Sequence, residues 1–293
     1  MTALPRVLLF GRAGQVGGEV VRLIEGRADV VAPAETQPDF RDADALRSAV
    51  RAARPTVIIN AAAYTAVDRA EAEPDVAHAV NAAAPGVLAE EAARLGALFI
   101  HYSTDYVFDG TKDAPYVETD ISAPLGAYGR SKLEGERRVL AAGGGCVILR
   151  TSWVYGPRGN NFLLTMLRLF AERDEVRVVD DQVGAPTTAR YLAEATLAVM
   201  DAAPGAERCG LYHCTAGGQT SWCGFARRIL ELDRRPEKRC ARVVPIATSA
   251  YPTPARRPAW SVLDSSRFSV AFGFRQRGWE ELLGEAMGEL GAG

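Results

Sequence analysis

The sequence contains very little lysine. Lys112, Lys132 and Lys238 are the only lysines among its 34 basic residues, and all the others are arginines. The net charge is −2 and no long basic run is present, so the chain lacks the features of a general nucleic-acid or membrane-surface binder. In a chain that otherwise uses arginine, each retained lysine is a candidate for chemistry that needs a compact ammonium.

Cysteines and long apolar runs are also scarce. The five cysteines are odd in number and irregularly spaced, which does not match a disulfide framework. His213 and Cys214 are adjacent, but the chain has no Cys-x-x-Cys pair, so reduced and mostly buried thiols are a better interpretation than a zinc site. No apolar stretch approaches the roughly 20 residues that cross a bilayer, and no signal-peptide pattern precedes the first expected strand. These absences predict a cytoplasmic protein with no membrane partner.

The first half of the chain alternates short apolar runs with amphipathic segments. The apolar runs, expected to be buried parallel strands, are 7–10, 30–32, 57–60, 98–102 and 147–149. The amphipathic segments, expected to be the connecting helices, are 15–25, 44–53, 75–95 and 127–141. This alternation predicts an α/β fold with a doubly wound, Rossmann-like parallel sheet, forming a dinucleotide-binding domain over residues 1–150.

Beyond Arg150 the pattern changes, and aromatic and turn-forming residues crowd into 153–161. The expected helices are then 162–172, 189–200, 222–231 and 279–290, and the expected strands are 176–179 and 211–214. Four prolines between 245 and 258 predict an ordered surface loop. We therefore expect residues 151–293 to form mainly a smaller C-terminal α/β substrate-binding domain, with some segments near 176–200 returning to the main sheet.

Three glycines lie where the first expected strand gives way to the first expected helix. Such glycines allow a tight turn and a close approach of the backbone to a dinucleotide, whose pyrophosphate rests on the helix N-terminus. Glycine-rich turns also occur for packing alone, but the strand–turn–helix setting favours cofactor binding. The residues of this turn expected to bind the cofactor are Gly11, Arg12, Gly14, Gln15, Val16 and Gly17.

Tyr128 and Lys132 are four residues apart in an expected helix, so their side chains lie on the same face. A free tyrosine has a pKa near ~10 and transfers protons poorly at neutral pH, so it needs a nearby cation that stabilises the phenolate. With a hydroxyl from Ser103 or Thr104, this pair is typical of a proton-donating apparatus. Adjacent strand residues point to opposite faces, so spacing alone leaves the choice of hydroxyl open.

Longer strings extend this pattern. They are Asn60-Ala-Ala-Ala-Tyr-Thr-Ala-Val-Asp68, His101-Tyr-Ser-Thr-Asp-Tyr-Val-Phe-Asp-Gly110, Arg150-Thr-Ser-Trp-Val-Tyr155, Asn160-Asn-Phe162 and Asp181-Gln-Val-Gly-Ala-Pro-Thr187. With the glycine turn and the Tyr128–Lys132 pair, they resemble the extended short-chain dehydrogenase/reductase family and, within it, the dTDP-4-dehydrorhamnose reductases. The resemblance runs from about residue 5 to the end of the chain and is weakest between about 202 and 256.

The resemblance implies an enzyme that reduces the 4-keto group of dTDP-4-dehydro-β-L-rhamnose to dTDP-β-L-rhamnose. Tyr128 would donate the proton, Lys132 would hold the nicotinamide ribose and lower the tyrosine pKa, and Thr104 would hydrogen-bond the substrate carbonyl. Reduction of another nucleotide-linked 4-keto-6-deoxysugar, or epimerisation, stays open. A non-catalytic regulatory subunit on the same fold is a further alternative, against which the intact set of three residues argues.

The resemblance also implies binding residues outside the glycine turn. For the cofactor they are Asp39, Phe40, Ala61, Ala62, Ala63 and Thr65, beside Tyr128 and Lys132. For the dTDP-sugar they are Thr104, Asp105, Trp153, Asn160, Asn161 and Gln182. Each of these residues also has an interpretation without ligand binding. Asp39 could simply be solvated, the alanines could pack a helix against the sheet, and Trp153 could be buried under the second domain. Asn81 either supports the site or is an ordinary helix-face asparagine.

The end of the second expected strand bears on the choice of cofactor. NAD-preferring sites often carry an acid there, whereas here Pro33 and Ala34 follow the strand and the nearest acid is Glu35. Arg12 lies in the glycine turn, where it could face a 2′-phosphate. The sequence therefore favours NADPH, with NADH also accepted in some relatives.

Some members of the family form a dimer through a magnesium site made of carboxylates. Glu19 and Glu289 could belong to such a set, but Arg190 stands where an acid would be needed, and a cation there opposes metal binding. We therefore expect no metal, and either a monomer or a homodimer.

Overall fold

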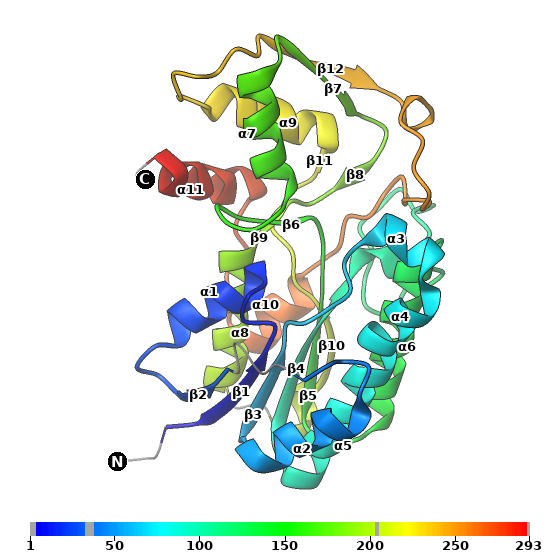
Figure 1. The fold of residues 1–293 in the computed structure, drawn as a ribbon, viewed down its shortest axis with the longest axis vertical. Helices are drawn as coiled ribbons and strands as arrows, with labels where there is room; N and C mark the ends of the chain where they lie inside the picture. Colours follow the sequence, from blue (N-terminus) through cyan, green and yellow to red (C-terminus); the bar gives the residue numbers. More distant parts are fainter. Residues whose placement is uncertain (1–3, 33–37, 203–204, 292–293) are drawn as a thin grey trace.

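The computed structural model describes residues 4–32, 38–202 and 205–291. Its main sheet has six parallel strands in the order β10-β5-β4-β3-β1-β2 (Figure 1). The strands are β1 (Arg6–Phe10), β2 (Asp29–Val31), β3 (Val57–Asn60), β4 (Leu98–Thr104), β5 (Cys146–Thr151) and β10 (Gly210–His213). The strand order reverses between β1 and β3, which is the switch point of a doubly wound sheet. The predicted Rossmann-like α/β fold is confirmed.

Side chains alternate between the two faces of this sheet. On β1, Val7 and Leu9 pack into one core, and Leu8 and Phe10 pack into the other. The helices on the Val7 face are α1 (Gln15–Ile24), α8 (Ala189–Ala202) and α10 (Ser266–Phe272) (Figure 1). Those on the Leu8 face are α2 (Ala43–Ala53), α5 (Ala84–Leu95) and α6 (Ala127–Ala141). Because both faces are covered, the strands read as nearly continuous apolar runs.

The helix expected over 75–95 is interrupted. The structure has α4 (Pro74–His78), a π-helical turn (Ala79–Ala83) and then α5. A further helix that the sequence did not predict, α3 (Val67–Ala72), precedes them. π-Helical turns are rare and often occur at functional sites, and this one carries the buried Asn81.

The second unit lies beyond the carboxyl ends of the main strands (Figure 1). It contains α7 (Phe162–Glu172), β7 (Glu175–Val179), α9 (Trp222–Leu232), β12 (Arg242–Ile246) and α11 (Trp279–Gly291), which share one apolar core. Within the segment 176–200, β7 pairs with β12 outside the main sheet, whereas α8 covers a face of that sheet. The strand that joins the main sheet from this half is β10. Pro245, expected to open a loop, lies instead in β12, opposite Val178.

Two short strand pairs join the units. β6 (Val154–Tyr155) pairs with β9 (Thr187–Thr188), and β8 (Val183–Gly184) pairs with β11 (Thr220–Ser221). All five cysteines are free thiols, and only Cys209 is not buried. No helix in the described ranges is both long and apolar enough to cross a bilayer.

Candidate active site

The glycine turn packs tightly against the end of β3. Gly11 has a φ of +82°, and a Cβ on it would lie 2.5 Å from the backbone nitrogen of Ala62. A Cβ on Gly17 would lie 2.2 Å from the carbonyl oxygen of Gly11. Glycine is therefore needed at both positions, the first for its backbone conformation and both for close packing. The result is that α1 begins at the carboxyl edge of the sheet, where doubly wound folds bind dinucleotides.

Arg12 reaches from this turn to the end of β2. Its Nη1 donates a hydrogen bond of 3.1 Å to the carbonyl oxygen of Ala32, and its side chain is exposed. The neighbouring residues Pro33, Ala34 and Glu35, on which the expected lack of an acid depends, lie outside the described residues. The guanidinium thus lies beside the position where the second strand would meet a bound ribose.

Asp39 and Phe40 have different surroundings. Asp39 pairs with Arg41 at 2.6 Å, and this hydrogen-bonded guanidinium lowers the pKa of Asp39 to about 2. Phe40 is buried and packs edge-to-face on Phe10, with ring centroids 5.6 Å apart. The carboxylate therefore faces solvent with a partner, and the aromatic ring belongs to the core of the Leu8 face.

Two buried asparagines shape the segment after β3. The Asn60 Oδ1 accepts from the backbone nitrogen of Ala62 at 3.2 Å. The Asn81 Oδ1 accepts from the backbone nitrogen of Tyr64 at 2.8 Å, and its Nδ2 donates to the Tyr64 carbonyl at 3.0 Å and to the Ser131 hydroxyl at 3.1 Å. These bonds hold residues 61–65 against α6. Of the four cofactor candidates here, Ala61 and Ala62 are half-buried, and Ala63 and Thr65 are exposed.

The hydroxyls of Ser103 and Thr104 point in different directions. The Ser103 hydroxyl donates to Glu136 at 2.5 Å, inside the protein. The Thr104 hydroxyl lies close enough to the Tyr128 phenol to influence its pKa, and its Oγ1 donates to Asp105 Oδ1 at 3.0 Å. Geometry therefore brings Thr104, and not Ser103, to Tyr128.

Burial shifts the pKa of both groups that would handle protons. It raises the pKa of Tyr128 to about 12, and the hydrogen bond with Thr104 opposes this rise. It lowers the pKa of Lys132 to about 8, with the negative charge of Glu136 acting in the opposite direction. The Lys132 ammonium donates to the Tyr102 carbonyl at 2.6 Å and lies 3.5 Å from His101 Nε2. In this structure Thr104 is therefore the side chain that lowers the pKa of Tyr128. Lowering of the Tyr128 pKa by Lys132 stays a prediction.

Asp105 is 2% exposed and lies beside both Thr104 and Tyr128. Burial raises its pKa to about 6, although hydrogen bonds with Ser261 and Thr104 oppose the rise. Its Oδ2 has no hydrogen-bond partner among the described residues. Asp105 therefore brings an incompletely paired carboxyl group to the site.

Behind the site lies a buried network of Ser103, Glu136 and Arg150. The Arg150 Nε donates to Glu136 Oε1 at 2.8 Å, and its Nη2 donates to Oε2 at 2.6 Å. Both side chains are at most 5% exposed. Glu136 was not predicted as a site residue, although its position four residues after Lys132 places the two on one face of α6.

Two glycines fix the position of α6. A Cβ on Gly129 would lie 2.2 Å from the Tyr106 carbonyl oxygen, and one on Gly135 would lie 2.1 Å from the Asn81 carbonyl oxygen. The helix that carries Tyr128 and Lys132 therefore contacts its neighbours backbone to backbone, which restricts sliding along its axis.

The expected substrate residues beyond β5 make contacts within the protein. Trp153 stacks on Trp222 with ring centroids 3.5 Å apart and an interplanar angle of 6°. The Gln182 Nε2 donates to the Thr248 hydroxyl at 2.9 Å. Asn160 is exposed.

Asn161 is 9% exposed and links the two units. Its Oδ1 caps α7 by accepting from the Leu164 nitrogen at 3.1 Å, and its Nδ2 donates to Gln15 Oε1 at 2.9 Å. Nδ2 also donates to the carbonyls of Gly156 and Arg158. Its side-chain amide is thus engaged between the glycine turn and α7, a role that the sequence did not suggest.

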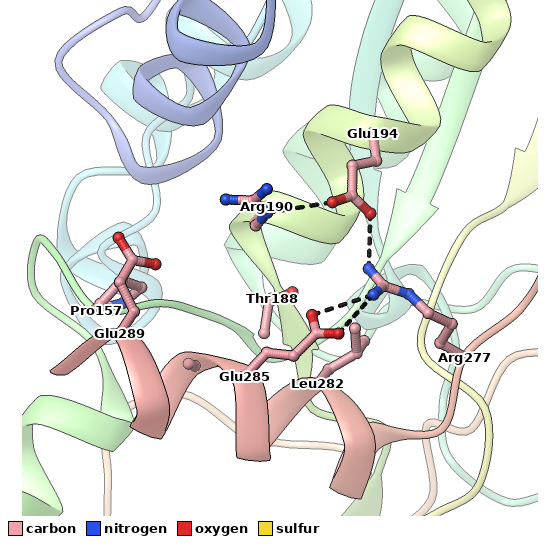
Figure 2. A pocket seen from close by; sticks show the side chains of 9 residues that line it. Pro157, Thr188, Arg190, Glu194, Arg277, Leu282, Glu285 and Glu289 are labelled. Atoms are coloured by element: carbon pink, nitrogen blue, oxygen red, sulfur yellow. Dashed lines mark hydrogen bonds and ion pairs between the residues drawn. The ribbon is translucent and has the colours of Figure 1, made fainter. Parts of the chain in front are cut away.

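The carboxylates considered for magnesium are paired with arginines. Arg158 donates to Glu19 at 3.1 Å and to Glu289, and so joins α1 to α11. In the pocket between α8 and α11, Arg190 pairs with Glu194 at 3.2 Å, and Arg277 pairs with Glu194 at 2.6 Å and with Glu285 at 2.9 Å (Figure 2). Three guanidiniums among four carboxylates do not fit a divalent cation, which needs oxygen ligands free of competing positive charge. We refer to these seven residues as the α1/α8/α11 charge cluster.

A dinucleotide-type glycine turn, a Tyr-x-x-x-Lys pair on α6 and a hydroxyl at the end of β4 define an extended short-chain dehydrogenase/reductase. The sequence matches the family model described as RmlD substrate binding domain over residues 5–291. The dTDP-4-dehydrorhamnose reductase of Burkholderia thailandensis is 47% identical over 294 residues, covering 97% of this chain and 99% of that protein. The corresponding protein of Escherichia coli (strain K12) is 42% identical, with 97% of each chain covered. The chain belongs to the dTDP-4-dehydrorhamnose reductase family.

Solved structures agree with this assignment. A crystal structure of dTDP-4-dehydrorhamnose reductase from Bacillus anthracis in complex with NADP has a TM-score of 0.91 at 34% identity, covering 98% of this chain and 99% of that one. The structure of a dTDP-4-dehydrorhamnose reductase from Clostridium acetobutylicum also has a TM-score of 0.91, at 38% identity, covering 97% of this chain and 99% of that one.

Proposed function

We propose that this protein uses NADPH to reduce the 4-keto group of dTDP-4-dehydro-β-L-rhamnose, which gives dTDP-β-L-rhamnose. The observation that carries the proposal is that Thr104, Tyr128 and the buried Lys132 gather at the end of β4, on the same carboxyl edge of the sheet as the glycine turn after β1. Family membership supports the choice of a dTDP-linked keto sugar. Within this proposal, residues 1–150 bind the cofactor and residues 151–293 contribute mainly to substrate binding.

The residues present fit a nicotinamide dinucleotide. The turn of Gly11, Arg12, Gly14, Gln15, Val16 and Gly17 would hold the pyrophosphate, and Ala61–Ala63, Thr65, Asp39 and Phe40 would flank the remainder. When bound, the reduced nicotinamide supplies the hydride that is added to the sugar carbon. Lys132 would hold the ribose and, as a buried cation, would favour charge development on Tyr128.

The protein's own residues account for the proton. Tyr128, with a pKa near 12 in this structure, is protonated at neutral pH and can donate to the developing alkoxide. Thr104 now donates to Asp105, and the same hydroxyl can donate to a substrate carbonyl instead. Trp153, Asn160, Asn161 and Gln182 are the residues proposed for the nucleotide-sugar side, with Asn161 acting through its link to Gln15.

Tyr128→Phe tests the proton donor. We expect cofactor affinity to be nearly unchanged and kcat to fall by about 10²–10⁴, the range typical of general acids. The assay follows loss of NADPH absorbance with the dTDP-keto sugar, and NMR reads the product stereochemistry. Tyr106→Phe is the matched control, because its ring packs edge-to-face on Tyr128 with centroids 5.7 Å apart. Near-normal turnover of Tyr128→Phe contradicts the role, and product formation by the wild type without NADPH consumption contradicts reduction.

The preference for NADPH depends on Arg12. A 2′-phosphate carries close to two negative charges, and an arginine fork can meet it with paired hydrogen bonds. We expect kcat/KM to favour NADPH over NADH by about tenfold to a hundredfold, and Arg12→Ala to erode this ratio while leaving NADH kinetics nearly unchanged. Arg27→Ala, which breaks an exposed pair with Asp201, serves as the control. A wild-type preference for NADH, or equal weakening of both cofactors by Arg12→Ala, would overturn this assignment.

A further inference from the structure

Trp153 has an unusual backbone conformation. Its φ is +47°, in the left-handed region, and among the described non-glycine residues only Arg54 shares this feature. Arg54 caps the C-terminus of α2, a position where that conformation is common. Trp153 caps no helix and lies two residues after the end of β5. A bulky side chain held in this region indicates strain that the surrounding structure maintains, and such strain gathers at binding sites.

Two residues of the second unit hold the Trp153 ring in place. The indole of Trp222, the first residue of α9, stacks on it with centroids 3.5 Å apart. At Gly184, in β8, an added Cβ would lie 2.6 Å from the Cε2 atom of Trp153. Phe162 in turn packs against Trp222 at 4.7 Å. Stacking on Trp222 and the missing side chain at Gly184 together form a slot for this ring.

The slot is connected to the candidate active site through short contacts. On the main sheet, Thr104 is paired directly with Thr151, two residues before Trp153. From the second unit, Val183 of β8 exchanges backbone hydrogen bonds of 2.8 Å with Ala259 and Ser261. Ser261 lies close enough to Asp105 to lower the pKa of that carboxyl, and Asp105 accepts a hydrogen bond from Thr104 at 3.0 Å. Both routes place the slot at the edge of the candidate active site.

We propose that Trp222 and Gly184 are positioning residues for substrate recognition, which hold Trp153 as an aromatic contact for the nucleotide-sugar. This inference rests on the proposed function for the identity of the substrate. A ring fixed before binding loses little freedom on contact, so the slot raises substrate affinity without touching the reacting atoms. Cofactor binding is not part of this role, because Trp222 and Gly184 contact the Trp153 ring and not the residues of the glycine turn.

Kinetics of two variants test the slot from opposite sides. Trp222→Ala removes the stacking partner, and Gly184→Ala pushes against the ring. For both we expect KM for the dTDP-keto sugar to rise about tenfold, the upper range for one ring contact, with kcat within about threefold and NADPH affinity unchanged. Trp222→Phe keeps a stacking ring and should restore most of the affinity. Trp279→Phe is the control, since Trp279 packs on Phe225 in the same unit.

Circular dichroism gives a readout that does not depend on turnover. Two indoles stacked this closely should produce an exciton couplet in the wild type, which Trp222→Phe and Trp222→Ala abolish and Trp279→Phe retains. Addition of dTDP alone should change the intensity of the wild-type couplet, because its thymine ring is a further chromophore beside the fixed Trp153 indole. The inference would be overturned if the wild type reduces the sugar and both variants keep a normal KM. It would also be overturned if dTDP leaves the couplet unchanged. If dTDP changes the couplet but no dTDP-keto sugar is reduced, the slot stands and the proposed reaction fails. Should Trp222→Ala not fold, Trp222→Phe, Gly184→Ala and the dTDP titration still decide.

Discussion

Two groups of paired charges serve different purposes in this molecule. In the buried network, Glu136 and Arg150 are at most 5% exposed and form a bidentate pair directly behind Lys132. In the α1/α8/α11 charge cluster, Arg158 and Arg190 are each 52% exposed. Each carboxylate there shares an arginine partner with another carboxylate. The first group is small and buried throughout, and the second is larger and mostly exposed, although Glu19 within it is only 6% exposed.

The difference has an energetic consequence. Removing one member of a buried pair leaves the other as an uncompensated charge, which costs far more than the pair contributes. Removing one member of an exposed cluster lets water and the remaining partners take over. The buried network also influences chemistry, because Glu136 supports the charge of Lys132, whereas the open cluster mainly ties α11 to α1 and α8.

The largest effect is expected from Glu136→Gln. This change removes the negative charge that Arg150 and Ser103 share, so we expect a loss of about 3–5 kcal/mol in the free energy of unfolding, measured in urea. The double variant Glu136→Leu/Arg150→Met leaves no unpaired charge and should recover most of the loss. Because Glu136 raises the pKa of Lys132, Glu136→Gln should also move the alkaline limb of kcat below about pH 8. A double variant no more stable than the single one would show that packing, and not charge, dominates.

Asp105→Asn should act in the opposite direction. Burial raises the folded-state pKa of Asp105 from 3.8 to about 6, so the ionised carboxylate destabilises the folded protein fully above pH 6 and not at all below pH 3.8. The asparagine lacks this cost, and we expect a gain on the order of 2 kcal/mol at pH 8 that shrinks as the pH falls through 6. Thermal unfolding at several pH values measures it.

Asp109→Asn is the control for this pH dependence. Hydrogen bonds from the backbone of Thr111 lower the pKa of Asp109, so its ionised form stabilises the folded state and the variant should lose stability at pH 8. A gain for Asp105→Asn that is independent of pH would assign the effect to something other than ionisation.

The smallest effect is expected from Arg158→Met. It separates Glu19 from Glu289, but Glu19 keeps Arg22 at 3.2 Å. We expect a loss of at most about 1 kcal/mol at low ionic strength that nearly disappears in 1 M salt. Arg168→Met, which breaks an exposed pair within α7, is the matched control. In the wild type, neither EDTA nor Mg²⁺ should change the melting temperature or the oligomeric state. A rise in melting temperature with Mg²⁺ would show that a cation displaces the arginines.

The sequence predicted the main sheet because its strands are buried on both faces and read as apolar runs. It missed the short helices α3 and α10, which are six and seven residues long, because so few turns give weak periodicity. Tyr128 and Lys132 could be predicted because they fit a helical spacing, whereas spacing left Ser103 and Thr104 open and only the family resemblance favoured Thr104. The contacts of Arg158 could not, since its partners are 139 and 131 residues away. The same holds for the stacking of Trp153 on Trp222, which depends on how the second unit folds back.

The π-helical turn of residues 79–83 has a consequence for how this chain can change length. Such a turn holds one residue more than an α-helix needs, so deleting a single residue would leave a continuous helix from α4 into α5. Because the turn absorbs the extra residue within itself, α4 and α5 would keep their faces, and the deletion would change the geometry of residues 79–83 alone. The Asn81 side chain would no longer face Tyr64 and Ser131, and its carbonyl oxygen would no longer lie against Gly135. A shortening that secondary structure tolerates would thus displace residues 61–65, which are proposed to flank the cofactor, and selection for activity should preserve the extra residue.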